Sequence, residues 1–108
     1  MAKLPNVIHI GPVTYDVKLV RKLDVLGETD CDNSEITILR TGQSRSSKRV
    51  TLLHEILHAV IGESAVRPDG HHKLPYVQEE ALVSALAPWL TAVLRDNPAV
   101  VAYLTADQ

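Results

Sequence analysis

The 108-residue sequence has a single cysteine, Cys31, and lacks any long run of apolar residues. One cysteine excludes an intrachain disulfide, so a reducing compartment is expected. The apolar runs are interrupted by His, Glu or Pro and fall short of the roughly 20 residues that a membrane-spanning helix needs. The first residues also lack the apolar core of a signal peptide. These absences predict a cytoplasmic protein with no membrane partner.

The sequence also lacks an excess of charge of either sign. Lys and Arg total 11 against 13 for Asp and Glu, which gives a net charge of −2. Such a balance offers no general attraction to nucleic acid, so we expect no nucleic-acid partner. The chain has no internal repeat, and 45% of its residues are hydrophobic. Its length and composition predict one domain over residues 1–108 with a modest core.

The first 40 residues have the alternating pattern of β-strands. Strands are expected at residues 6–10, 13–20, 23–29 and 35–39, separated by turn-forming residues such as Gly11-Pro12 and Asp30–Ser34. The short connections favour hairpins, so the sequence predicts a small antiparallel sheet in residues 1–40.

The hydrophobic period becomes helical after residue 44. We expect a helix over residues 44–62, a second over 76–96 and a short third over 99–105. Pro88 removes a backbone amide from the second helix, which predicts either a kink near residues 84–88 or two abutting helices. The apolar stripe expected to bury the first helix consists of Val50, Leu53, Leu57, Val60 and Ile61.

The first helix contains the sequence His54-Glu55-Ile56-Leu57-His58, which has the HExxH pattern. Histidines four residues apart lie about 40° apart around a helix and one turn along it, so both imidazoles can reach one metal ion. Glu55 projects from the edge of the same face, where a carboxylate can hold and deprotonate a metal-bound water. The pattern predicts a zinc site with His54 and His58 as ligands and Glu55 as general base.

A catalytic zinc ion usually has three protein ligands and an open fourth position. The HExxHxxGxxH pattern is excluded because Ser64 stands where its third histidine would be. His71 and His72 lie in the connection between the helices and are candidates. Glu79 and Glu80 begin the second helix and are the other candidates.

The helical periodicity of residues 76–96 does not choose between the two glutamates. Glu79 lies nearer an apolar stripe formed by Leu82, Leu86, Trp89 and Val93. Glu80 lies on a side with smaller residues, which allow two helices to approach closely. That second side consists of Val83, Ser84, Ala87 and Thr91.

Residues 51–59 and 80–87 together resemble the ImmA/IrrE-type metallopeptidases and their small phage-encoded relatives. These proteins carry HExxH followed by a glutamate helix of pattern E-x-x-A-x-x-F-A, and the wider gluzincin group has a similar helix. In this sequence Val83 and Ala87 occupy the third and seventh positions after Glu80. The resemblance implies Glu80 as the third ligand.

Together these observations predict an α+β fold, a minimal zincin-like domain in which the sheet packs on the HExxH helix and the glutamate helix crosses it. The expected function is a zinc metallopeptidase with one zinc per chain and a peptide or protein substrate, which could lie along an edge strand. Tyr76, His71 or His72 could stabilise the oxyanion, although Tyr76 could equally be a packing residue. The alternatives are a non-catalytic phage-type protein whose zinc only stabilises the fold, and a protein-binding domain with a degenerate site.

Overall fold

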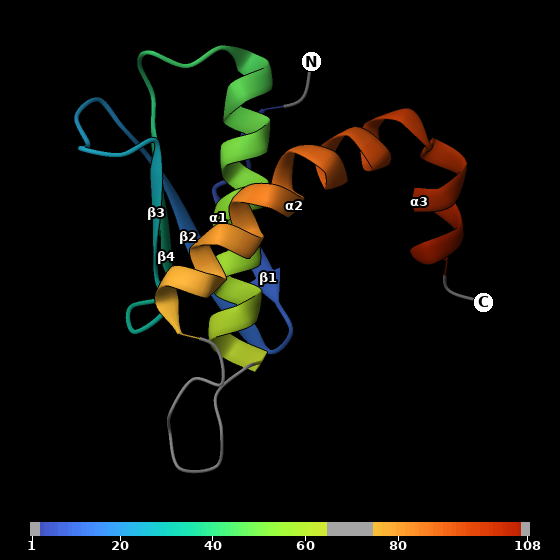
Figure 1. The fold of residues 1–108 in the computed structure, drawn as a ribbon, viewed down its shortest axis with the longest axis horizontal. Helices are drawn as coiled ribbons and strands as arrows, with labels where there is room; N and C mark the ends of the chain where they lie inside the picture. The colour runs from blue at the N-terminus through green and yellow to red at the C-terminus, as the bar shows by residue number, and fades with distance from the viewer. Residues whose placement is uncertain (1–2, 65–74, 107–108) are drawn as a thin grey trace.

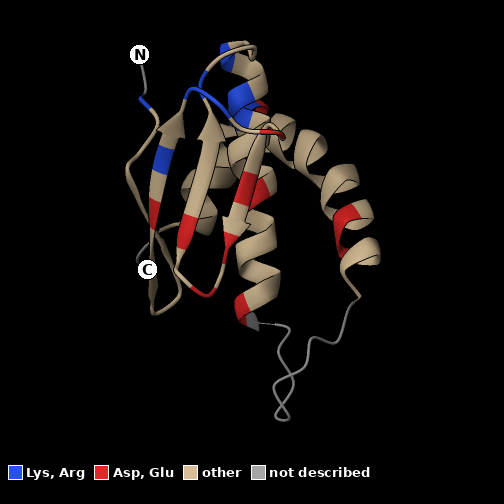
Figure 2. Cartoon of the chain, turned by 90° about the vertical axis from the view of Figure 1, so that its left-hand side faces the viewer, with Lys and Arg blue, Asp and Glu red and all other residues tan. Residues whose placement is uncertain are grey.

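Four strands and three helices occupy the part of the chain that the structure describes, residues 3–64 and 75–106 of a computed structural model (Figure 1). Together they form a small α+β fold, as predicted. Helix α1 lies between the sheet and α2 (Figure 2). Among the described residues, none of the helices has the length and apolar character required to cross a membrane. The strands are β1 (Val7–Ile10), β2 (Val13–Val20), β3 (Gly27–Asp30) and β4 (Glu35–Leu39), and the helices are α1 (Arg45–Ser64), α2 (Tyr76–Asp96) and α3 (Pro98–Leu104).

The sheet is mixed, with strand order β1-β2-β4-β3, so the prediction of an antiparallel sheet is wrong. Strands β1 and β2 form an antiparallel hairpin, and so do β3 and β4, but β2 and β4 are parallel. The two hairpins join through their second strands, β2 and β4, which carry the buried residues of the described sheet, Tyr15, Val17, Ile36 and Ile38. Strand β3 has the sequence Gly-Glu-Thr-Asp, which suits an edge.

The core lies between the sheet and α1. Tyr15 and Val17 of β2 and the two isoleucines of β4 face Ala59 of the helix. The apolar stripe predicted for α1 is not its buried face, since Val60 is exposed. Because α1 is covered by the sheet on one side and by α2 on another, its small and polar residues are buried as well. These buried residues of α1 are Thr51, Glu55, His58, Ala59 and Gly62.

The helices begin and end near the predicted positions. Helix α1 extends over residues 45–64 rather than 44–62, α2 covers residues 76–96 as expected, and α3 covers 98–104 rather than 99–105. Helix α2 runs through Pro88 as one helix, so the alternative of two abutting helices is wrong. The second half of α2 leaves α1 and carries α3 away from the sheet (Figure 1).

Candidate metal centre

The site forms where α2 crosses α1. Val83 and Ala87 of α2 and Ala59 of α1 are fully buried, and such small side chains let the two helix backbones approach closely. The first turns of α2 therefore lie beside His54 and His58 of α1. Helical periodicity placed Glu79 nearer the stripe that contains Leu82, but in the structure Glu79 is buried together with Val83 and Ala87.

Three ligand atoms from these helices converge on one point. Glu80 Oε1 lies 2.9 Å from His54 Nε2 and 2.8 Å from His58 Nε2, and the two nitrogens are 3.2 Å apart. Ligand atoms placed about 2.0–2.1 Å from a tetrahedral zinc ion are about 3.3 Å from one another. Shifts of a few tenths of an ångström would therefore open this cluster enough to hold a metal ion. Among the described residues, it is the group whose donor atoms are close enough to share one ion.

Glu79 contacts the opposite nitrogen of His58. Its Oε2 lies 2.6 Å from His58 Nδ1, and both side chains are buried. A carboxylate at this position accepts a hydrogen bond from Nδ1–H, and in that tautomer the Nε2 lone pair is directed at the cluster. Glu79 and Glu80 are thus divided between the two ring nitrogens of His58, and Glu80 is the glutamate that joins both histidines.

The contacts between these groups perturb their protonation. Burial acts to lower the pKa of His58, but hydrogen bonds to Glu79 and Glu80 outweigh burial and raise this pKa above its ordinary value. Burial acts in the opposite direction on Glu80, and its hydrogen bonds to His58 and His54 lower its pKa. The carboxylates that favour a proton on His58 would also favour a metal cation at the same place.

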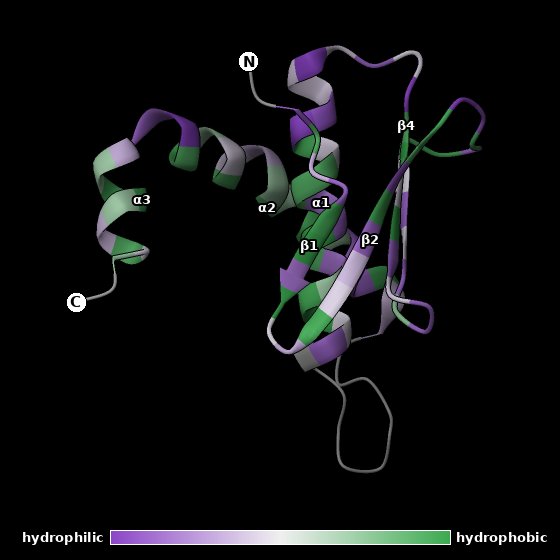
Figure 3. Ribbon diagram, turned by 180° about the vertical axis from the view of Figure 1, so that it is seen from behind, coloured by the Kyte–Doolittle hydropathy of each residue, from purple (hydrophilic) through white to green (hydrophobic). Residues whose placement is uncertain are grey.

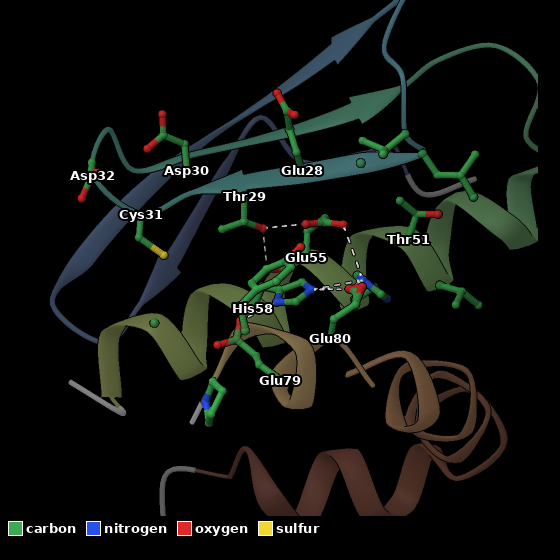
Figure 4. A pocket seen from close by; sticks show the side chains of 18 of the residues that line it. Glu28, Thr29, Asp30, Cys31, Asp32, Thr51, Glu55, His58, Glu79 and Glu80 are labelled. Atoms are coloured by element: carbon green, nitrogen blue, oxygen red, sulfur yellow. Dashed lines mark hydrogen bonds and ion pairs between the residues drawn. The ribbon is translucent and has the colours of Figure 1, made fainter. Parts of the chain in front are cut away.

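Glu55 is buried beside the cluster and is held by strand β3 (Figure 4). Its Oε2 lies 3.9 Å from His54 Nε2, while its Oε1 accepts a hydrogen bond of 2.7 Å from the Thr29 hydroxyl. Burial raises the pKa of Glu55 above its ordinary value. One carboxylate oxygen is thereby anchored and the other lies nearer the histidines.

Sequence reasoning missed the two residues of β3 that position Glu55. Thr29 supplies the hydrogen bond, and Gly27 supplies the space. A Cβ atom at Gly27 would lie 2.9 Å from Thr51 Cγ2 and 3.2 Å from Glu55 Oε2. The glycine inside a predicted strand was the available signal, because such a residue often marks the close approach of another segment.

The cluster borders a cleft of about 1140 Å³ between β3, the turn that follows it, α1 and the start of α2 (Figure 4). Six acidic residues line it, and none of its described lining residues is Lys or Arg. Figure 2 shows the Lys and Arg residues gathered toward the other end of the sheet and α1. The charge of this cleft favours the approach of a cation.

Three further candidates from the sequence, Tyr76, His71 and His72, have different outcomes. Tyr76 lines the cleft and stacks on His58, with 6.1 Å between the ring centroids and 13° between the planes. This contact fits the packing alternative that the sequence offered for Tyr76. His71 and His72, candidates for a ligand or an oxyanion donor, lie outside the described residues.

Comparison of the chain with models of protein families, with curated proteins and with solved structures gives no match.

Proposed function

We propose that this protein is a zinc-dependent peptidase in which His54, His58 and Glu80 hold one zinc ion. The observation that carries the proposal is the convergence of two imidazole nitrogens and one carboxylate oxygen beside a second, buried carboxylate. The donor set of two histidines and one glutamate is typical of catalytic zinc. When bound, zinc would polarise a carbonyl group and lower the pKa of a coordinated water toward neutrality.

Glu55 is the proposed general base. Its Oε2 is the oxygen left free by the Thr29 hydrogen bond, and it lies on the histidine side of the carboxylate. From there it would take the proton of the attacking water and pass it to the leaving amine. A zinc ion that only stabilises the fold needs no such carboxylate, so Glu55 favours the catalytic function over the structural one.

Glu79 is the proposed positioning residue. By accepting a hydrogen bond from Nδ1–H of His58, it would fix the ring orientation and the tautomer whose Nε2 can bind a metal ion. The two glutamates therefore have different proposed roles at one site: Glu80 binds the metal ion, and Glu79 orients the ligand His58.

The cleft suits an extended peptide. Strand β3 is at the edge of the sheet, pairs with β4 on one side and lines the cleft together with Glu55 and both histidines. A substrate backbone added along β3 would pass the metal site, as extended ligands do at other sheet edges. The resemblance of the motif segments to ImmA/IrrE-type metallopeptidases supports the same assignment.

The test has two stages. Purified protein is expected to contain about one zinc per chain, measured by elemental analysis, and His54→Ala together with His58→Ala is expected to lose it. His9→Ala is the matched control, because His9 is exposed on β1 and its Nδ1 lies 3.1 Å from Thr14 Oγ1. Wild-type protein that binds no zinc after reconstitution would overturn the proposal.

The second stage separates chemistry from metal binding. Glu55→Gln is expected to keep zinc and to lower peptide cleavage by about 10³-fold, the effect of removing a general base. Cleavage is followed by mass spectrometry on a mixture of unstructured peptides. If Glu55→Gln cleaves these peptides as fast as the wild type, the catalytic assignment is wrong.

A further inference from the structure

The apolar stripe that the sequence places on the second helix is exposed to solvent. Leu82, Leu86, Trp89 and Val93 follow the i, i+4, i+7, i+11 spacing of one helix face, and Trp89 is 75% exposed. The body of the protein is packed instead against the face formed by Glu79, Val83 and Ala87. We call Leu82, Leu86, Trp89 and Val93 the α2 stripe.

Helix α3 exposes apolar residues as well. It packs against the end of α2, and none of its seven residues, all of them described, is buried. Tyr103 is 82% exposed, and Val100 and Leu104 are exposed as well. Figure 3 shows hydrophobic residues along the part of α2 and α3 that projects from the body of the molecule.

The projecting part is also electrically neutral. From Ala81 to Ala106 the sequence has one cation and one anion, Arg95 and Asp96, and these two bind each other at 2.8 Å and 3.1 Å. Helices that bind anionic membranes carry several Lys or Arg residues on the polar face, and this one does not. A partner recognised through charge is therefore not favoured.

The size of the apolar surface fits a dimer. The four residues of the α2 stripe and Val100, Tyr103 and Leu104 present roughly 700 Å², of which the two aromatic side chains supply about 300 Å². A stable protein interface buries about 800 Å² on each partner. The occupant that needs no charge complementarity and offers the same apolar area is a second copy of this chain.

We propose that two copies associate through the α2 stripe and α3 about a two-fold axis. In such an isologous contact each surface packs against itself. An antiparallel crossing near Trp89 sets Leu86 of each copy against Val93 of the other. Glu80 lies about 160° from Leu82 around the helix, so the dimer leaves the metal centre and its cleft uncovered.

The test is the mass of the protein in solution. Sedimentation equilibrium from about 1 to about 300 µM is expected to give a mass that rises from 11.9 kDa toward twice that value. Trp89, the one tryptophan of the chain, reports the same event, because its emission shifts to shorter wavelength when the dimer covers it. A mass that stays at 11.9 kDa over the whole range overturns the proposal.

Substitutions locate the interface. Trp89→Asp together with Tyr103→Asp is expected to raise the dimer dissociation constant by about 100-fold, since buried aromatic residues dominate interface energies. Val77→Asp is the control, because Val77 is 78% exposed on α2 but lies about 140° from Leu82 around the helix. Unchanged circular dichroism and zinc content show that the variants remain folded. A double variant that dimerises as tightly as the wild type overturns the assignment of the surface.

Discussion

The two halves of α2 differ in the relation between polarity and burial. The first half buries a carboxylate, since Glu79 is 8% exposed, whereas the second half exposes Trp89. Glu79 is held by His58, so its burial is compensated by a hydrogen bond between charged or partly charged groups. Among the described residues, none covers the exposed apolar surface of Trp89 in the monomer, where its exposed fraction is 75%. Charged side chains are usually exposed and large apolar ones buried. The first half of α2 departs from this pattern at the candidate metal centre, and the second half departs from it at the surface that we assign to association.

This contrast separates two functional demands that we propose for one helix. A buried carboxylate costs free energy and persists where a function depends on it. An exposed apolar stripe favours association and persists where a partner covers it. Substitutions at Glu79 should therefore change metal affinity and folding, and substitutions at Trp89 should change assembly alone.

The largest effect is expected at Glu80. Glu80→Ala removes a proposed ligand and should weaken zinc affinity by at least about 10³-fold, whereas Glu79→Ala removes the partner of His58 and should weaken it by about 10- to 100-fold. Competition with a chromophoric chelator measures both. The difference in zinc affinity between the two variants shows which of the two carboxylates binds the metal directly.

Glu28→Ala is the matched control for this pair. Glu28 is an exposed acid that lines the same cleft, so its removal changes the charge of the cleft without removing a proposed ligand. We expect less than a threefold change in zinc affinity. If Glu79→Ala alone loses the metal, the division of roles between the two glutamates is reversed.

A smaller effect is expected from apolar truncation in the two halves. Val83→Ala leaves a cavity where α2 meets α1 and should lower the free energy of unfolding by about 2 kcal/mol. Trp89→Ala removes a much larger side chain, yet at low micromolar concentration it should change that free energy by less than about 0.5 kcal/mol. Urea denaturation followed by circular dichroism measures both values. A loss above 1 kcal/mol for Trp89→Ala in the monomer would show that the stripe stabilises the fold itself.

The periodicity of apolar residues predicted the bounds of α2 and β2, because that periodicity is a property of the local sequence. Helical periodicity placed α2 over residues 76–96, and alternation placed β2 over 13–20. The spacing of His54 and His58 on one helix put both rings on the same side, and the structure brings Glu80 to them. For the two elements and the histidine pair, the information lies within a few turns of helix or a few residues of strand.

Contacts between distant segments were not predictable from these patterns. The parallel pairing of β2 with β4 depends on which strands of the two hairpins meet, and the hairpin signals alone favoured an antiparallel sheet. The buried face of α1 was missed because periodicity does not show that two elements cover the same helix. Likewise, nothing near Glu79 in the sequence shows that His58 would hold it.

The smallest effect is expected at Thr29, which links the sheet to the site. Thr29→Val keeps the shape of the side chain but removes the hydroxyl group 2.7 Å from Glu55 Oε1, so the carboxylate loses its anchor. We expect a loss of about 1 kcal/mol in the free energy of unfolding and, because Glu55 can then rotate, about a tenfold lower peptidase kcat with unchanged zinc content. Thr37→Val on β4 is the control, since Thr37 lies between Ile36 and Ile38 and alternation turns it away from the core and α1. Equal kcat values for the two variants would show that burial alone holds Glu55 in place, and the contribution of β3 to the site would then reduce to the space at Gly27.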